Sequence, residues 1–256
     1  MKEDYRNFKH AVLCSIAFLG VYVAVYSAQN TQTAIYDADG YESLGYVSNS
    51  VAYVGQGIGS VFCVYCMQRV GDVKAMAFGS LLNLPFILIL ILPALNGKAT
   101  SVDNFFYSYP FVTAITVCTS FLNGLGQGVA QPASGKYIAD CATERTKGFF
   151  FAFFWAFYMG SQVIGSLISA VTLGFMEQYY YVLVMFMICS LSIWLMHHLK
   201  QPLIMHESHP LNQHVSDQHP PQALLINDSL NDSLVHPDSP LTQATSVEQR
   251  RPQESQ

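Results

Sequence analysis

The chain has 256 residues, of which 51% are hydrophobic and only 11% are charged, and its formal net charge is −5. Because a soluble domain usually carries about 25% charged residues, this composition argues against an ordinary cytosolic enzyme. The sequence also lacks a basic patch of the kind that follows a phosphate backbone, so it does not indicate a nucleic-acid-binding protein. It indicates a multi-pass membrane protein.

Six apolar stretches are long enough to cross a bilayer, which takes roughly 20 residues for about 30 Å of hydrocarbon. None of the Asp, Glu, Lys and Arg residues falls inside these stretches, which supports their assignment. The predicted spans are residues 11–29, 44–67, 75–93, 110–130, 149–174 and 179–199. We therefore predict an all-α membrane domain of six transmembrane helices over residues 1–199.

The lysines and arginines predict the orientation of these spans. All of them except Lys98 lie before the first span, in the links between spans two and three and between spans four and five, or after span six. Positively charged residues gather on the cytoplasmic side of a membrane protein. The sequence thus predicts that both termini are cytoplasmic, without indicating whether the membrane is the plasma membrane or an internal one.

The polar part of the chain begins at residue 200. Residues 200–256 contain no Phe, Tyr or Trp and are rich in Pro, Ser, Gln and Asn. Such a segment does not bury enough apolar surface to offset the loss of chain entropy on folding. We predict a disordered cytoplasmic tail over residues 200–256.

Spans two and five share a short sequence pattern. Both contain Tyr, Gly and Gln, followed by Ile-Gly-Ser, at residues 53–60 and 158–166. Spans that are three apart cross the membrane in opposite directions, so the match predicts a three-plus-three inverted repeat. This arrangement is typical of each six-helix half of a major facilitator.

Several glycines have the spacing that lets two helices approach closely in lipid. We expect them to pack helices together inside the bundle, and the alternative is a face for dimer formation. These helix-packing glycines are Gly55, Gly59, Gly124, Gly128 and Gly165.

The polar side chains within or next to the spans are mainly neutral amides. The spans contain no carboxylate, whereas proton-coupled carriers usually rely on buried ionisable groups. Neutral amides either line a cavity or join helices by hydrogen bonds, and we interpret the tyrosines and phenylalanines as packing or lipid-facing residues. The candidate cavity-lining residues are Gln29, Asn30, Gln32, Gln56, Asn123, Gln127 and Gln162.

No set of residues predicts an enzyme. Ser134 with His197 and His198 has the residue types of an intramembrane protease, but these residues are expected at the water interface, without the shelter that such a pair needs. Cys63 and Cys66 lie in span two without a second pair or a neighbouring His, so we interpret them as packing residues. The sequence predicts no catalytic residue, no metal site and no cofactor.

Several of these motifs together resemble the UNC-93-like branch of the major facilitator superfamily. They are residues 28–32 at the end of span one, 40–46 at the entry to span two, 123–128 in span four and 153–157 in span five. The link after span two, with Arg69, Gly71 and Lys74, is similar to a degraded form of the facilitator loop motif, with Gln68 where an acidic residue is expected. The resemblance covers residues 8–199, the N-terminal half of the family fold.

Two functions follow as hypotheses. The resemblance implies a non-enzymatic regulatory or trafficking subunit of an ion-channel or receptor complex, with another membrane protein as its partner. The alternative is a half-size facilitator that forms a homodimer and transports a small solute or ion. A further possibility is that the chain is half of a longer protein, because members of the family usually have eleven or twelve spans.

Overall fold

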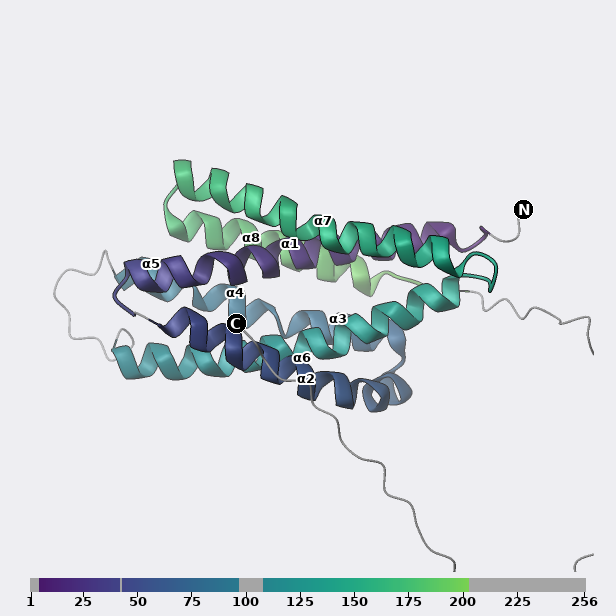
Figure 1. Ribbon diagram of the computed structural model, residues 1–256, viewed down its shortest axis with the longest axis horizontal. Helices are drawn as coiled ribbons and strands as arrows, with labels where there is room; N and C mark the ends of the chain where they lie inside the picture. Colours follow the sequence, from purple (N-terminus) through teal and green to yellow (C-terminus); the bar gives the residue numbers. More distant parts are fainter. Residues whose placement is uncertain (1–4, 42, 97–107, 203–256) are drawn as a thin grey trace, which may run out of the picture. The chain divides into compact units, whose positions relative to one another are not determined.

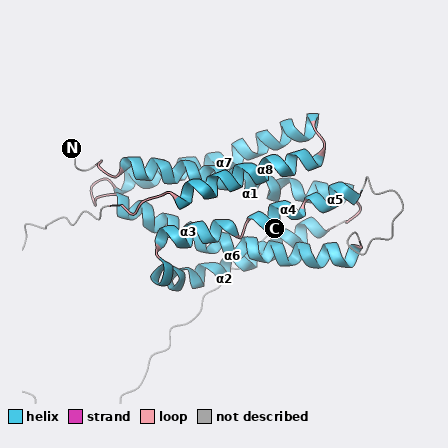
Figure 2. Cartoon of the chain, turned by 180° about the vertical axis from the view of Figure 1, so that it is seen from behind, coloured by secondary structure: helices cyan, strands magenta, loops and turns pink. Residues whose placement is uncertain are grey.

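The computed structural model describes residues 5–41, 43–96 and 108–202. All of the regular structure in this part of the chain is helical (Figures 1 and 2). The elements in chain order are α1 (Phe8–Ala38), α2 (Leu44–Val70), α3 (Asp72–Leu81), α4 (Leu84–Ile89), α5 (Ile91–Asn96), α6 (Tyr109–Cys141), α7 (Lys147–Phe175) and α8 (Gln178–His197).

The third predicted span does not form one helix but is broken into the short helices α3, α4 and α5. The break has a simple covalent cause. A proline cannot donate a hydrogen bond to the carbonyl four residues earlier, and its ring clashes with that carbonyl. α3 ends at Leu81, four residues before Pro85, and α4 ends at Ile89, four residues before Pro93.

The first predicted span was too short. α1 continues past residue 29 to Ala38, because the added turns are held by the bundle, with Gln32, Ile35 and Tyr36 all buried. Among the described residues, five helical segments are long and apolar enough to cross a membrane: α1, α2, residues 72–93, α7 and α8.

The fourth predicted span is the exception to this apolar pattern. It forms α6, which has 33 residues and is therefore about 50 Å long, but it is not among the apolar segments. α6 packs against both α2 and α3, and many of its buried positions are occupied by glycine and by small or polar residues such as Thr116, Ser120 and Asn123. A helix that is covered by other helices does not need an apolar surface, which explains its composition.

The helix contacts follow the predicted inverted repeat. One repeat consists of α1, α2 and α3–α5, and the other consists of α6, α7 and α8. α1 packs on α7 and α8, and α6 packs on α2 and α3 in the same way, so that the first helix of each repeat contacts the second and third helices of the other. This exchange is the arrangement that a two-fold axis between the repeats produces.

Glycines hold α2 and α6 backbone to backbone. A Cβ atom built on Gly55 would lie 2.6 Å from the carbonyl oxygen of Phe121, and one on Gly59 would lie 2.5 Å from that of Leu125. From the other side, a Cβ on Gly124 or Gly128 would overlap the backbone of α2. Only glycine permits such an approach, which brings the two helices into extensive van der Waals contact.

The charged residues of the described bundle are divided between its two ends. The end formed by the N-terminus of α3 and the C-terminus of α6 carries Asp72, Lys136 and Asp140, and Lys136 donates hydrogen bonds to both carboxylates. These bonds, first to Asp140 and then to Asp72, raise the pKa of Lys136. The described lysines and arginines all lie in or beside helix ends on this side: Arg6, Lys9, Arg69, Lys74, Lys136, Arg145, Lys147 and Lys200.

Candidate functional site

A chain of hydrogen bonds links four helices near the middle of the bundle. The Gln56 side chain on α2 donates to Oε1 of Gln131 on α6 over 3.0 Å, and Nε2 of Gln131 donates to the hydroxyl of Tyr158 on α7 over 2.8 Å. The Tyr158 hydroxyl is also hydrogen-bonded to the hydroxyl of Tyr26 on α1. Gln56, Gln131 and Tyr26 are only partly buried, so this chain is within reach of a small molecule.

A pocket of about 280 Å³ adjoins this chain. Gln131, Ser134 and Tyr158 bring polar atoms to its wall, and aromatic rings from α1 and α7 form most of the rest. None of the lining side chains is charged. The lining residues are Phe18, Gln131, Pro132, Ser134, Gly135, Phe151, Phe154, Trp155 and Tyr158.

The rings around the pocket form one continuous cluster between α1 and α7. Phe18 lies 5.3 Å from Phe154, and Tyr22 lies 5.0 Å from Tyr158, measured between ring centroids. Trp155 meets Tyr158 edge to face at 5.0 Å. Aromatic faces combined with neutral hydrogen-bonding groups suit an uncharged solute that has both polar and apolar surface.

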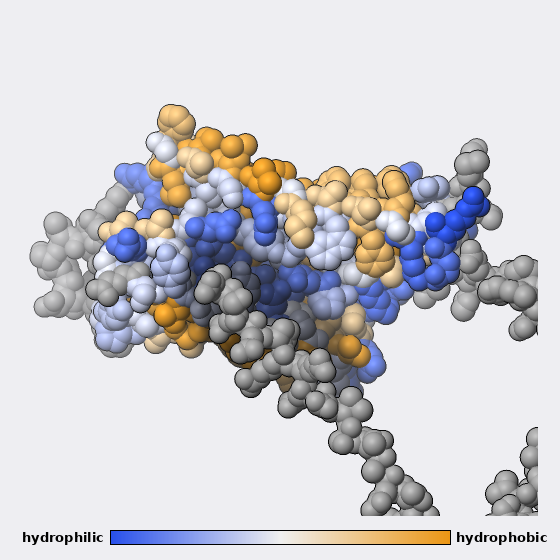
Figure 3. Space-filling model, viewed as in Figure 1, coloured by the Kyte–Doolittle hydropathy of each residue, from blue (hydrophilic) through white to orange (hydrophobic). Residues whose placement is uncertain are grey.

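The same side of the bundle carries apolar ridges on α2 and α7. Figure 3 shows hydrophilic residues gathered in a hollowed band, with hydrophobic residues above and below it. Large apolar side chains on both helices are more than half exposed, which in a membrane protein leaves a surface for lipid or for another protein. They include Tyr53, Val54, Val61, Phe62, Val64 and Tyr65 on α2, and Met159, Val163, Leu167, Val171 and Phe175 on α7.

A family model described as the Major Facilitator Superfamily matches residues 11–231 of the chain. The chain belongs to the major facilitator superfamily. Among solved structures, it is similar to the inward-open conformation of the xylose transporter XylE from E. coli, with a TM-score of 0.56 and 17% sequence identity. The structural match covers 77% of this chain and 48% of XylE, so the chain spans about half the length of that transporter. No curated protein sequence matches the chain.

One amide predicted from the sequence, Gln56, belongs to the hydrogen-bonded chain that links α2, α6, α7 and α1. Gln32 was expected at the end of a span but lies inside α1, where it accepts a hydrogen bond from Ser48 over 2.9 Å, and Ser48 in turn contacts Ser120 on α6 at 2.6 Å. Gln32 therefore joins α1, α2 and α6, away from the aromatic pocket.

The other candidate amides lie elsewhere in the bundle. Gln29, Asn123 and Gln127 are buried, and the side-chain amide of Asn123 has no hydrogen-bonding partner among the described residues. Asn30 and Gln162 are exposed. Asn30 donates to Ser166 on α7 over 3.4 Å, and Gln162 lies beside the Tyr26 hydroxyl at the end of the polar chain. The structure therefore brings these residues to several places along the helices and not to one cavity.

Four residues that build the site were not among the candidates predicted from the sequence: Tyr26, Tyr158, Trp155 and Gln131. The tyrosines were interpreted as packing or lipid-facing residues. Gln131 follows Gln127 by one helical turn in a stretch of α6 that is otherwise glycine and small residues. A second amide one turn from the first was the available signal, but the sequence does not show which helix faces it.

The link that resembles the facilitator loop motif lies at the end of the bundle that carries the described lysines and arginines, the basic end. Gly71 has φ +86° where α2 turns into α3, a conformation that residues with a Cβ rarely adopt. The Arg69 guanidinium lies 5.4 Å from the ring centroid of Tyr65. Lys74 is exposed on the first turns of α3.

Proposed function

We propose that the chain is a facilitator half that binds a small, uncharged polar solute in the pocket beside Gln131 and Tyr158. The observation that carries this proposal is the composition of the pocket wall, which combines neutral hydrogen-bonding groups and aromatic rings without a charged side chain. A charged solute entering a membrane domain needs an opposite charge, which this wall does not offer.

A carrier of this superfamily encloses its solute between two six-helix halves. We propose that a second copy of the chain provides the other half and packs on the exposed apolar residues of α2 and α7. These ridges flank the polar band on both sides, so that a partner placed on them would cover the pocket and shield its polar atoms from lipid.

The first test is uptake by proteoliposomes that contain the purified full chain. Radiolabelled xylose is a suitable probe, because it is uncharged and polar and because the similar fold of XylE belongs to a xylose transporter. We expect saturable uptake that is lost in Gln131→Leu and kept in the control Gln201→Leu, which changes an exposed glutamine outside the pocket. Uptake that is insensitive to Gln131→Leu would contradict the proposal.

The second proposed function is the regulatory one. The motifs that resemble the UNC-93-like branch, together with the apolar ridges on α2 and α7, support a subunit that binds a channel or receptor through the same face. Extraction from the native membrane in a mild detergent separates the two proposals. A homodimer supports the carrier, and a stoichiometric complex with a different multi-pass protein and no solute uptake supports the regulatory subunit.

A further inference from the structure

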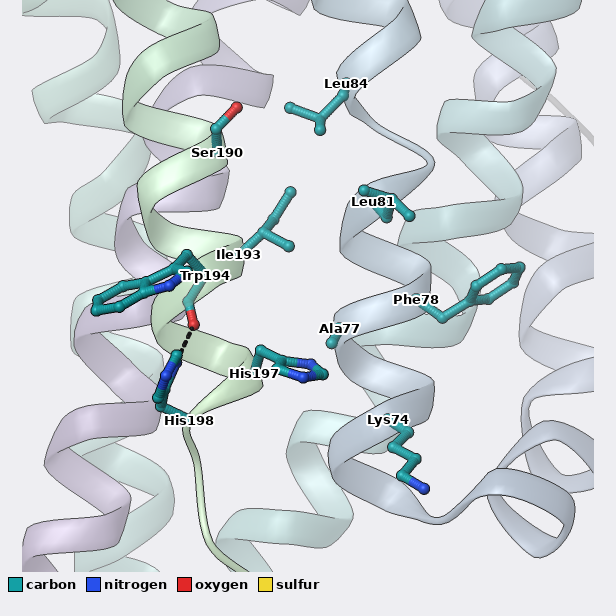
Figure 4. Close-up of a pocket in the computed structure, with 10 residues that line it drawn as sticks. All are labelled: Lys74, Ala77, Phe78, Leu81, Leu84, Ser190, Ile193, Trp194, His197 and His198. Carbon is teal, nitrogen blue, oxygen red and sulfur yellow. Dashed lines mark hydrogen bonds between the residues drawn. The ribbon is translucent and has the colours of Figure 1, made fainter.

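A second hollow lies between α3 and α8, helices that Figure 1 places behind α2 and α7 and that Figure 2 shows from the other side. It is a groove of about 530 Å³, and nearly all of its wall is apolar. Figure 4 shows Ile193 of α8 pointing into it across from Leu81 and Leu84. The groove does not share a lining residue with the aromatic pocket.

One end of this groove is polar and basic. Lys74 and His197 lie together at the end nearest the α2–α3 turn, and the apolar residues lie toward the other end (Figure 4). At that basic end the groove adjoins a smaller hollow of about 330 Å³, to which Gly71 and Gln201 also contribute. Lys74, Ala77 and His197 line both spaces, so the two form one site with an apolar body and a polar head.

The charge on Lys74 is not balanced by a carboxylate of the described residues. Two other lysines of this end differ in this respect, because Lys136 is paired with Asp72 and Asp140 and Lys147 is paired with Glu144. Lys74 is exposed, and its side chain extends from α3 toward the α2–α3 turn at the basic end of the groove, away from the apolar residues (Figure 4). The site therefore favours a ligand with an anionic head.

The length of the groove matches one leaflet of a bilayer. From Lys74 to Leu84 the chain advances ten residues, mostly helical, which corresponds to about 15 Å at 1.5 Å per residue. This is about half of the roughly 30 Å hydrocarbon thickness of a bilayer. An acyl chain whose headgroup is held at Lys74 would thus extend along the groove to the middle of the membrane.

We propose that this groove binds one anionic phospholipid, with an acyl chain against Leu81, Leu84 and Ile193 and its phosphate bound by Lys74 and His197. The inference is independent of the solute pocket and of its proposed function. Anionic lipids are concentrated in the cytoplasmic leaflet, where the basic end of the bundle is predicted to lie. The bound lipid would cover the seam between the third helix of each repeat.

The two tryptophans of the chain allow a direct test, because Trp194 is at the edge of the groove and Trp155 is in the aromatic pocket. The full chain carrying Trp155→Phe is reconstituted in phosphatidylcholine bilayers, and Trp194 fluorescence is quenched with brominated lipid. We expect brominated phosphatidylserine to quench Trp194 more strongly than the same fraction of brominated phosphatidylcholine.

Two pairs of variants locate the binding site. Lys74→Gln is expected to weaken the preference for phosphatidylserine about fivefold, the factor that corresponds to ~1 kcal/mol for one lysine near the surface. Lys9→Gln, which removes an exposed lysine of the same end but from α1, is expected to leave the preference unchanged. Ala77→Phe fills the groove and should abolish the preference, whereas Met187→Phe adds the same ring on exposed α8 surface and should not.

Three results would overturn the proposal. Equal quenching by the two lipids would show that the basic end does not select a headgroup. An equal loss in Lys9→Gln and Lys74→Gln would show general attraction to the charged surface and no site. Finally, a photoreactive residue at Phe78 should cross-link to phospholipid in the native membrane, and a cross-link to residues 203–256 or to a second copy would assign the groove to a different occupant.

Discussion

The two most extensive helix–helix contacts of this bundle, which we call seams, are those of α2 with α6 and of α1 with α7. The inverted repeat relates one seam to the other, yet they are built in different ways. Between α2 and α6, glycines bring the two backbones together, with Gly55 and Gly59 facing Gly124 and Gly128. Between α1 and α7, Gly165 approaches the carbonyl oxygen of Val23 at one level, and aromatic rings fill the rest of the contact. The same topology thus supports a tight seam and a looser one.

The difference shows where a facilitator half has room for a site. Two helices in backbone contact leave no space between them, whereas helices held apart by Phe and Tyr side chains leave gaps that a ligand can enter. The pocket beside Gln131 and Tyr158 lies on the aromatic seam, and the polar chain through Gln56 connects it to the glycine seam. We expect the glycine seam to provide stability and the aromatic seam to provide binding.

The largest effect is expected from a bulky residue in the glycine seam. In Gly124→Leu the new side chain would overlap the backbone of α2, and we expect more than ~3 kcal/mol of destabilisation, because backbone atoms have no room to shift. The folded, monodisperse fraction in detergent, measured by size-exclusion chromatography, should fall sharply. Gly160→Leu is the control, since a Cβ at that position meets open space. If both variants behave alike, the tight seam does not stabilise the fold.

A smaller and more specific effect is expected from the aromatic seam. Tyr158→Phe keeps the ring but removes the hydroxyl that Gln131 donates to, so we expect solute affinity to fall about tenfold, or ~1.5 kcal/mol, with little loss of stability. Tyr46→Phe removes a hydroxyl from an exposed ring of α2 outside the site and serves as the matched control. The apparent affinity for xylose in proteoliposomes checks the prediction. An unchanged affinity in Tyr158→Phe would show that the hydroxyl does not contribute to solute binding.

The link between the two seams is expected to contribute less. Gln56→Leu breaks the 3.0 Å hydrogen bond to Gln131, and interhelical bonds in membranes average about 0.6 kcal/mol. The free energy of unfolding in mixed SDS micelles should fall by that amount, with about a threefold loss of affinity, because Gln131 then loses the group that orients it. Gln68→Leu is the control, since Gln68 is an exposed glutamine of the same helix and lies outside the pocket. A larger loss in the control would argue against this orienting role.

The smallest effect is expected at the basic end. Asp72→Asn removes one of the two carboxylates that bind Lys136, leaving Asp140 at 2.9 Å. Exposed ion pairs contribute roughly 0.2–1 kcal/mol, so we expect a change in unfolding free energy of a few tenths, which decreases further as salt is raised. A loss of several kcal/mol, independent of salt, would show that this cluster holds α3 and α6 together more strongly than the seam does.

The six helical segments and their repeat symmetry could be predicted from the sequence, but the breaks in the third segment, the helix ends and the helix neighbours could not. Apolar stretches indicated the spans, but α1 runs beyond its stretch because Gln32 and Tyr36 are buried in the bundle, and the proline breaks within the third span depend on local covalent geometry that hydropathy does not report. The composition of α6 reflects its contacts with α2 on one side and α3 on the other, and a single sequence does not reveal which helices are neighbours.

The site was less predictable than the fold for a related reason. Membrane amides were selected by residue type, and this identified Gln56 but also Gln29 and Asn123, which the structure buries elsewhere. Tyr158 has the same residue type as many packing tyrosines, and its role depends on the rotation of α7 and on the depth of Gln131 in α6. Those two quantities are tertiary, so no pattern in the sequence specifies them.

The measurement that tests the account most directly compares Trp155 with Trp194 in bilayers. Trp155 is isolated by Trp194→Phe, and its fluorescence is quenched with acrylamide from water and with brominated phosphatidylcholine from lipid. If a second facilitator half covers a water-filled solute site, acrylamide will quench Trp155 and brominated lipid will not, while Trp194 will show the opposite behaviour. If brominated lipid quenches Trp155 as strongly as Trp194, then the aromatic pocket opens to the bilayer and the proposed solute site is contradicted.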